Sequence, residues 1–111
     1  METSVIWFDL DSTDPKLEPA DIIQKIAEVL KENSGQHVQV NGHASKEGSK
    51  QHNQELSDKR AEAIKQLLLK EGVNETQIHT KGYSSAVSYK PKAGQHEISL
   101  DRRVEIIPVN E

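Results

Sequence analysis

The chain has 111 residues, a net charge of −4, a mean hydropathy of −0.74 and no cysteine. This length fits one domain, residues 1–111, with a modest core. The acidic balance argues against nucleic acid as a partner, because phosphate contacts need a concentrated basic face. The lack of cysteine excludes a disulfide framework and thiolate metal sites.

The chain offers no candidate for a membrane span or a leader. No apolar run approaches the roughly 18 residues that a span needs, so we expect no direct insertion of this domain into a membrane. Residues 1–5 lack the basic and apolar regions of a secretory signal peptide. The sequence is therefore expected to be either a cytosolic protein or one domain of a longer exported chain.

The first elements are a strand and a helix. Residues 5–8 are a run of β-formers, which predicts a strand buried on both faces. After a segment rich in turn formers, Pro19 suits the first turn of a helix. Residues 33–35, which tolerate the left-handed conformation, are expected to end it. Its apolar stripe consists of Ile22, Ile23, Ile26, Ala27 and Leu30.

A second strand and helix follow. Residues 37–41 alternate between apolar and polar side chains, which predicts a half-buried strand. A loop at 42–49 leads into a helix over about 50–71, and Gly72 is a suitable residue to end it. The predicted core face of this helix consists of Leu56, Ala63, Ile64, Leu67 and Leu68.

The last third is predicted to hold two strands, at 77–83 and 104–107, separated by a long polar loop at 84–99. The element order is therefore β-α-β-α-β-β. This order is typical of an α/β two-layer sandwich, with two helices packed on one face of a mixed sheet.

Two central stretches carry a family resemblance. Residues 41–49 read N-G-H-A-S-K-E-G-S and residues 53–61 read N-Q-E-L-S-D-K-R-A. Together they resemble the signature of the OmpA C-terminal-like family, G-H-T-D followed by a glycine and N-x-x-L-S-x-x-R-A. Three further segments are similar to the family's opening, third and closing strands: W-F-D at 7–9, K-G-Y at 81–83 and D-R-R-V-E-I at 101–106. The resemblance covers almost the whole chain.

The resemblance implies a binding module and no enzyme: noncovalent attachment to the peptide stem of peptidoglycan, in the periplasm or cell envelope, as a domain of a longer exported protein. In the family an arginine pairs with the carboxylate of diaminopimelate and an aspartate accepts from its ammonium. The matching arginine is Arg60. The aspartate position holds Ser45, and the threonine before it is replaced by Ala44.

Arg60 has the chemistry for this role, because a guanidinium matches a carboxylate bidentately. Asn53 lies seven residues earlier, close to two helical turns, so both side chains are expected on one face. The amino end of the helix also favours an anion. We expect Arg60 to be exposed in a pocket. The alternative is an ion pair with Asp9, Glu55 or Asp101 that closes the fold.

Flanking charges could complete the pocket. Asp9 follows the first strand, where it is either near the ligand or a plain turn residue. Because side chains alternate along a strand, only one of Arg102 and Arg103 can face the pocket. The alternative for both arginines is a role as simple surface charges.

Ser45 leaves an open question, because a hydroxyl cannot hold an ammonium by charge. Glu47 or Asp58 could supply the missing charge, or the ligand could be a variant stem peptide. Alternatively, the domain has lost peptidoglycan and serves as a protein–protein interaction or scaffold module, with protein partners or a dimer as its targets.

Other chemistry has weaker support in the sequence. His43, Ser45 and Glu47 lie within five residues, but no G-x-S-x-G elbow is present and we expect no catalysis. No cofactor is indicated. The histidines are scattered without the spacing of a helical zinc site, so no metal is expected at His37, His43, His52, His79 and His96.

Overall fold

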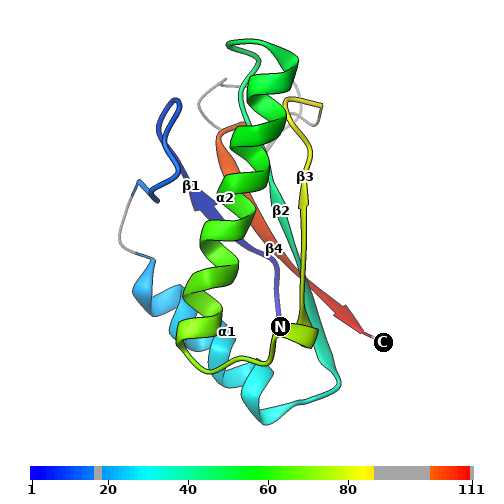
Figure 1. Cartoon of the computed structure of the whole chain (residues 1–111). Coiled ribbons are helices and arrows are strands. Elements are labelled where there is room, and N and C mark those ends of the chain that lie inside the picture. Colours follow the sequence, from blue (N-terminus) through cyan, green and yellow to red (C-terminus); the bar gives the residue numbers. More distant parts are fainter. Residues whose placement is uncertain (17–18, 87–100, 111) are drawn as a thin grey trace.

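The computed structural model describes residues 1–16, 19–86 and 101–110, and its elements follow the predicted order β-α-β-α-β-β. Both helices cover one face of a single four-stranded sheet (Figure 1), which confirms the predicted two-layer sandwich. The elements are β1 (Ser4–Trp7), α1 (Ala20–Glu32), β2 (Gln36–Gly42), α2 (Lys50–Lys70), the 3-10 helix η1 (Glu75–Gln77), β3 (Ile78–Gly82) and β4 (Arg103–Asn110).

The sheet is mixed, with strand order β1-β4-β2-β3. β2 and β3 are parallel and are joined through α2, whereas β4 runs antiparallel to both β1 and β2. In the register, Arg103 lies opposite Trp7, and Gly42 lies opposite both Val104 and Gly82. The ends of β1, β2 and β3 and the start of β4 therefore meet at one end of the sheet, the upper end in Figure 1.

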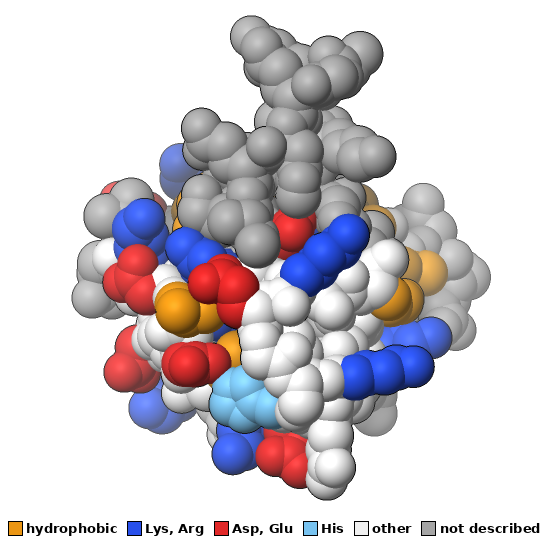
Figure 2. Space-filling view, turned by 90° about the horizontal axis from the view of Figure 1, so that it is seen from above, with side chains coloured by type: hydrophobic (Ala, Val, Ile, Leu, Met, Phe, Trp, Pro, Cys, Tyr) orange, Lys and Arg blue, Asp and Glu red, His pale blue; other side chains and the backbone are white. Residues whose placement is uncertain are grey.

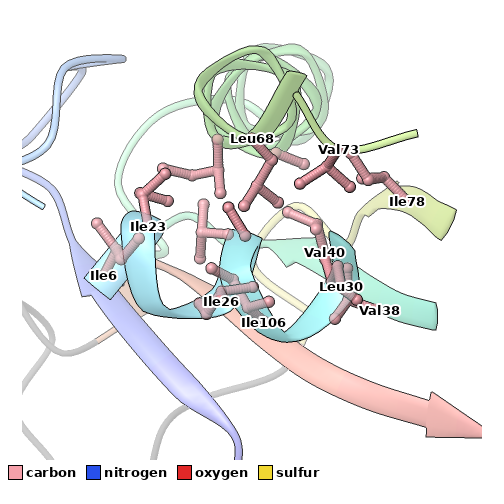
Figure 3. Close-up of a cluster of buried hydrophobic side chains, with 14 of the residues drawn as sticks. Ile6, Ile23, Ile26, Leu30, Val38, Val40, Leu68, Val73, Ile78 and Ile106 are labelled. Carbon is pink, nitrogen blue, oxygen red and sulfur yellow. The ribbon is translucent and has the colours of Figure 1, made fainter. Parts of the chain in front are cut away.

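The core lies between the helices and the sheet (Figure 3). The predicted stripe of α1 is confirmed except at Ile22, which is 39% exposed. On α2, Ala63 and Leu67 are only half-buried. Leu56, Ile64 and Leu68 are buried as predicted. The buried face of α2 also contains Asn53, Ser57, Arg60 and Ala61.

Close packing explains where the buried face of α2 lies. A Cβ on Gly42 would collide with the backbone carbonyl of Ser57, and a Cβ on Gly82 would collide with Asp58. Both glycines thus let α2 approach the ends of β2 and β3. The helix ends as predicted, at Gly72 with φ +90°.

The strands differ from the predictions chiefly at β1 and β4. β1 lies at the edge of the sheet, and within it only Ile6 is fully buried, so the prediction of burial on both faces is wrong. β4 extends beyond the predicted 104–107, from Arg103 to Asn110. The predicted loop at 84–99 falls largely outside the described residues. None of the helices in the described ranges is long and apolar enough to span a bilayer.

Candidate functional site

The residues that carry the family resemblance gather at the end of the sheet where the strand ends meet. The loop after β2, the start of α2 and the start of β4 all lie there (Figure 1). Figure 2 looks onto this end and shows basic and acidic side chains interspersed across it.

Arg60 is the centre of this arrangement, and its side chain is fully buried, so the expectation of an exposed arginine is wrong. Its guanidinium bonds to three backbone carbonyls: Nε donates to Ser12 at 2.9 Å, Nη1 to His43 at 2.9 Å and Nη2 to Asp9 at 2.8 Å. Its Cζ also lies 5.2 Å from the ring centroid of Phe8. Arg60 therefore ties the loop after β1 and the end of β2 to α2.

The alternative of a closing ion pair with Asp9 is wrong, because Arg60 bonds to the backbone carbonyl of Asp9 and not to its carboxylate. The carboxylate of Asp9 points elsewhere, 3.8 Å from Lys16, and is 67% exposed. The pKa of Arg60 is lowered to about 10, mainly by burial and also by the nearby charge of Arg102, although Asp11 acts to raise it. Arg60 remains a cation at neutral pH, with a second guanidinium close to it.

Ser45 and Ala44 are both buried in the loop after β2. The backbone N–H of Ala44 donates to Ser84 at 2.8 Å, which fixes the loop against the chain after β3. The hydroxyl of Ser45 donates to Oε1 of Glu47 at 3.0 Å. A carboxylate thus lies one hydrogen bond from the position at which the family signature has an aspartate.

Glu47 is held a second time, by Nη1 of Arg102 at 3.2 Å. Its side chain is 46% exposed and that of Arg102 is 15% exposed. As alternation along the chain predicts, the neighbouring Arg103 takes a different direction and pairs with Glu105 at 3.4 Å. Of the two arginines, Arg102 is therefore the one beside Glu47.

Asn53 is buried in the first turn of α2, on the same buried face as Arg60. Ser49 caps this helix, accepting from the backbone of His52 at 3.1 Å. Asp58 does not face Arg60; its carboxylate accepts from Gln54 at 3.0 Å on the side of β3. Glu47, and not Asp58, is thus the acid at the Ser45 position.

Sequence reasoning missed a second polar cluster, on the face of the sheet away from the helices. His43 is buried there, with Nε2 3.0 Å from Oε1 of Glu105 and its ring stacked on Tyr83 at 5.2 Å. The pKa of His43 is lowered to about 4, mainly by burial and also by the charge of Arg103, although Glu105 and Asp101 act to raise it. The sequence did contain one signal for this cluster: strand alternation places residues 41 and 43 on one face of their strand, and residues 103 and 105 on one face of theirs.

The other described histidines lie apart from this cluster. His37 and His79 contact each other at 2.9 Å across β2 and β3, and His52 pairs with Asp11 at 2.8 Å. Within the described ranges, no three or more histidine, cysteine or acidic residues gather as possible metal ligands. His96 lies outside the described residues.

Comparison with known proteins agrees with this fold. The model of the OmpA family matches residues 7–102. Outer membrane porin F of Pseudomonas fluorescens is 31% identical over 90% of this chain and 31% of its own length. The peptidoglycan-associated lipoprotein of Pseudomonas aeruginosa is 29% identical over 93% of this chain and 61% of its own length.

The fold has close structural neighbours. The crystal structure of the peptidoglycan-associated lipoprotein from Burkholderia pseudomallei superposes with a TM-score of 0.86 at 23% identity, covering 95% of this chain and 89% of that one. The chain spans less than two thirds of the length of the two relatives named above. With a family match over most of its residues and the expected two-layer sandwich, the chain belongs to the OmpA family.

Proposed function

We propose that this domain binds the peptide stem of peptidoglycan noncovalently and anchors a longer envelope protein to the cell wall. Family membership and the similarity to peptidoglycan-associated lipoproteins support the proposal. The observation that carries it is the carboxylate of Glu47, held at the hydroxyl of Ser45. The negative charge that Ser45 itself lacks is thereby supplied from two residues further along the chain.

The charges suit a ligand group that is both an ammonium and a carboxylate, as is the free end of diaminopimelate. In the proposed complex Glu47 accepts from the ammonium, which releases Arg102 to donate to the ligand carboxylate. Arg60 lies beneath as a buried cation and adds to the attraction for that carboxylate.

The remaining candidate residues have supporting roles in this proposal. Buried Asn53 and Ala44 shape the floor of the loop, and Asn53 offers an amide to the stem backbone if the loop shifts. Asp9 contributes its carbonyl to Arg60, and Arg103 belongs to the cluster on the opposite face of the sheet.

A second candidate function is a protein–protein interaction module with the same fold. The observation that favours it is that Arg60 already donates to three carbonyls while Glu47 already pairs with Arg102. Such internal pairing satisfies the charges without an external ligand.

Sedimentation with purified insoluble peptidoglycan of the diaminopimelate type, at moderate salt, tests the proposal. The variant is Glu47→Gln and the matched control is Glu75→Gln, since Glu75 is also an exposed acid in an ion pair, with Lys65 at 3.1 Å. Losing one charge-assisted bond of about 1.5–3 kcal/mol should weaken binding by roughly 10- to 150-fold. Glu75→Gln should sediment like the wild type.

Three results would contradict the proposal in part or in full. If Glu47→Gln sediments like the wild type, Glu47 is not the partner of the ammonium. If wall material with lysine in place of diaminopimelate binds equally well, the arginines do not read the ligand carboxylate. If the wild type does not sediment at all, the domain is an interaction module and its partner is a protein.

A further inference from the structure

His43, at the end of β2, makes four separate contacts. Its Nε2 lies 3.0 Å from the carboxylate of Glu105, and its ring stacks on Tyr83 with an interplanar angle of 9°. Its backbone N–H donates to the carbonyl of Arg103 at 2.8 Å. Its own carbonyl receives Nη1 of Arg60 at 2.9 Å. One residue thus connects the outer face of the sheet to the buried guanidinium on the helix side.

The protonation state of this imidazole follows from its surroundings. The carboxylate of Glu105 can only accept, so Nε2 carries the proton. The charged groups that face the ring are Glu105, Arg103 and Asp101, and burial outweighs the acids in keeping it neutral. Nδ1 is then an acceptor, and among the described residues it has no hydrogen-bond partner.

We propose that His43 is a positioning residue for the site, whose imidazole, held by Glu105 and Tyr83, fixes both the carbonyl that receives Arg60 and the loop that carries Ser45. The binding consequence rests on the proposed function, whereas the geometric consequence does not.

The position of His43 in the chain supports this role. Ala44 and Ser45 follow it directly, and the N–H of Ala44 is fixed to Ser84 at 2.8 Å. A rotation of the peptide after His43 would therefore move the Arg60 acceptor and the Ser45 hydroxyl together. The positions of Arg60 beneath the site and of Glu47 at its rim therefore both depend on His43.

A role in packing alone explains the imidazole less well. A phenyl ring at this position could stack on Tyr83 without burying an acceptor at Nδ1 that lacks a described partner. A buried polar atom without a partner destabilises a fold. The imidazole is the poorer choice for stability, which points to a use for its hydrogen bond to Glu105.

Three variants separate these roles. His43→Gln keeps a neutral N–H donor that can reach Glu105, and His43→Phe keeps the stacking surface but loses the donor. His79→Gln is the control, since it changes a histidine on β3 that is exposed and distant in register from His43. All three are first checked for the native amide spectrum by NMR.

The first readout is the rotation of the Arg60 guanidinium, followed by nitrogen-15 NMR of its Nη groups. The second is the affinity for a soluble diaminopimelate stem peptide, measured by calorimetry per folded molecule. We expect slow rotation in the wild type, His43→Gln and His79→Gln. We expect fast rotation in His43→Phe, with affinity about tenfold lower, as for the loss of one hydrogen bond.

Slow rotation and unchanged affinity in a folded His43→Phe variant would overturn the proposal and leave His43 as a packing residue. If that variant does not fold, the same readouts on Glu105→Leu decide, since it removes the acceptor of the imidazole while keeping the stacking contact with Tyr83. Slow rotation there overturns the proposal, and fast rotation supports it. A wild type that binds no stem peptide refutes the proposed function, and the guanidinium signals still decide the positioning role.

Discussion

Acidification should destabilise this protein through His43, because the folded state holds its imidazole in the neutral form. The pKa is lowered from the ordinary value of 6.5 to about 4, mainly by burial and then by the charge of Arg103. The unfolded chain therefore binds a proton at a higher pH than the folded chain does. At roughly 1.4 kcal/mol per pKa unit, this difference removes about 3 kcal/mol of stability on full acidification.

The pH range of this effect follows from the lowering of the His43 pKa on folding. The contribution of His43 is fully present above pH 6.5, is lost as the pH falls from 6.5 to about 4, and changes no further below that. His43→Gln cannot bind the proton, so its stability should lack this part of the slope. The side chain is only 2% exposed, so solvent screening does not reduce the effect.

The assay is urea unfolding of the wild type and His43→Gln at pH 7, 5.5 and 4, with the slope against urea checked for constancy. All other ionisable groups are common to both proteins, so the difference between the two curves reports on His43 and its pairing with Glu105. We expect this difference to change by about 3 kcal/mol across the window. Parallel curves would mean that the folded state accepts the proton at His43 as readily as the unfolded chain does.

Three further substitutions have defined outcomes. Arg60→Lys keeps the charge but cannot reach three carbonyls at once, and urea unfolding should show a loss of about 3–5 kcal/mol; an unchanged midpoint would mean that these bonds add nothing. Ser45→Asp alone should bring no gain in peptidoglycan binding, because it adds a second carboxylate beside Glu47, whereas the double change Ser45→Asp with Glu47→Gln should bind more tightly in calorimetry. Gly42→Ala should lose about 1–3 kcal/mol in thermal unfolding because its Cβ meets a backbone carbonyl of α2, while Gly35→Ala, with open space around it, should not be destabilised.

The order of the elements could be predicted from the sequence because each one carries its own periodicity. The stripe of α1 repeats at helical spacing, and Val38 and Val40 alternate with polar residues along β2. These patterns are local, and the predicted order β-α-β-α-β-β is the observed one. What local patterns do not contain is the place of each strand in the sheet. β1 therefore looked like a buried strand although it lies at the edge.

The same distinction applies to the buried face of α2. Hydrophobicity selected Leu56, Ile64 and Leu68 correctly but also Ala63 and Leu67, which are only half-buried. Close contact at Gly42 and Gly82 instead brings the side with Ser57 and Ala61 against the sheet. That side carries Arg60, which explains why a charged residue is fully buried there.

For the candidate site, the sequence by itself determined which residues to consider. The resemblance to the family signature singled out Arg60 and Ser45, and the missing charge at Ser45 brought Glu47 into consideration as the substitute acid. Only the tertiary structure decided what these residues touch. The acceptors of Arg60 are backbone carbonyls, one of them at Ser12, 48 residues away in sequence. Because every residue has a backbone carbonyl, the sequence cannot indicate which carbonyls will accept from Arg60. Only the folded chain brings these carbonyls within hydrogen-bond distance.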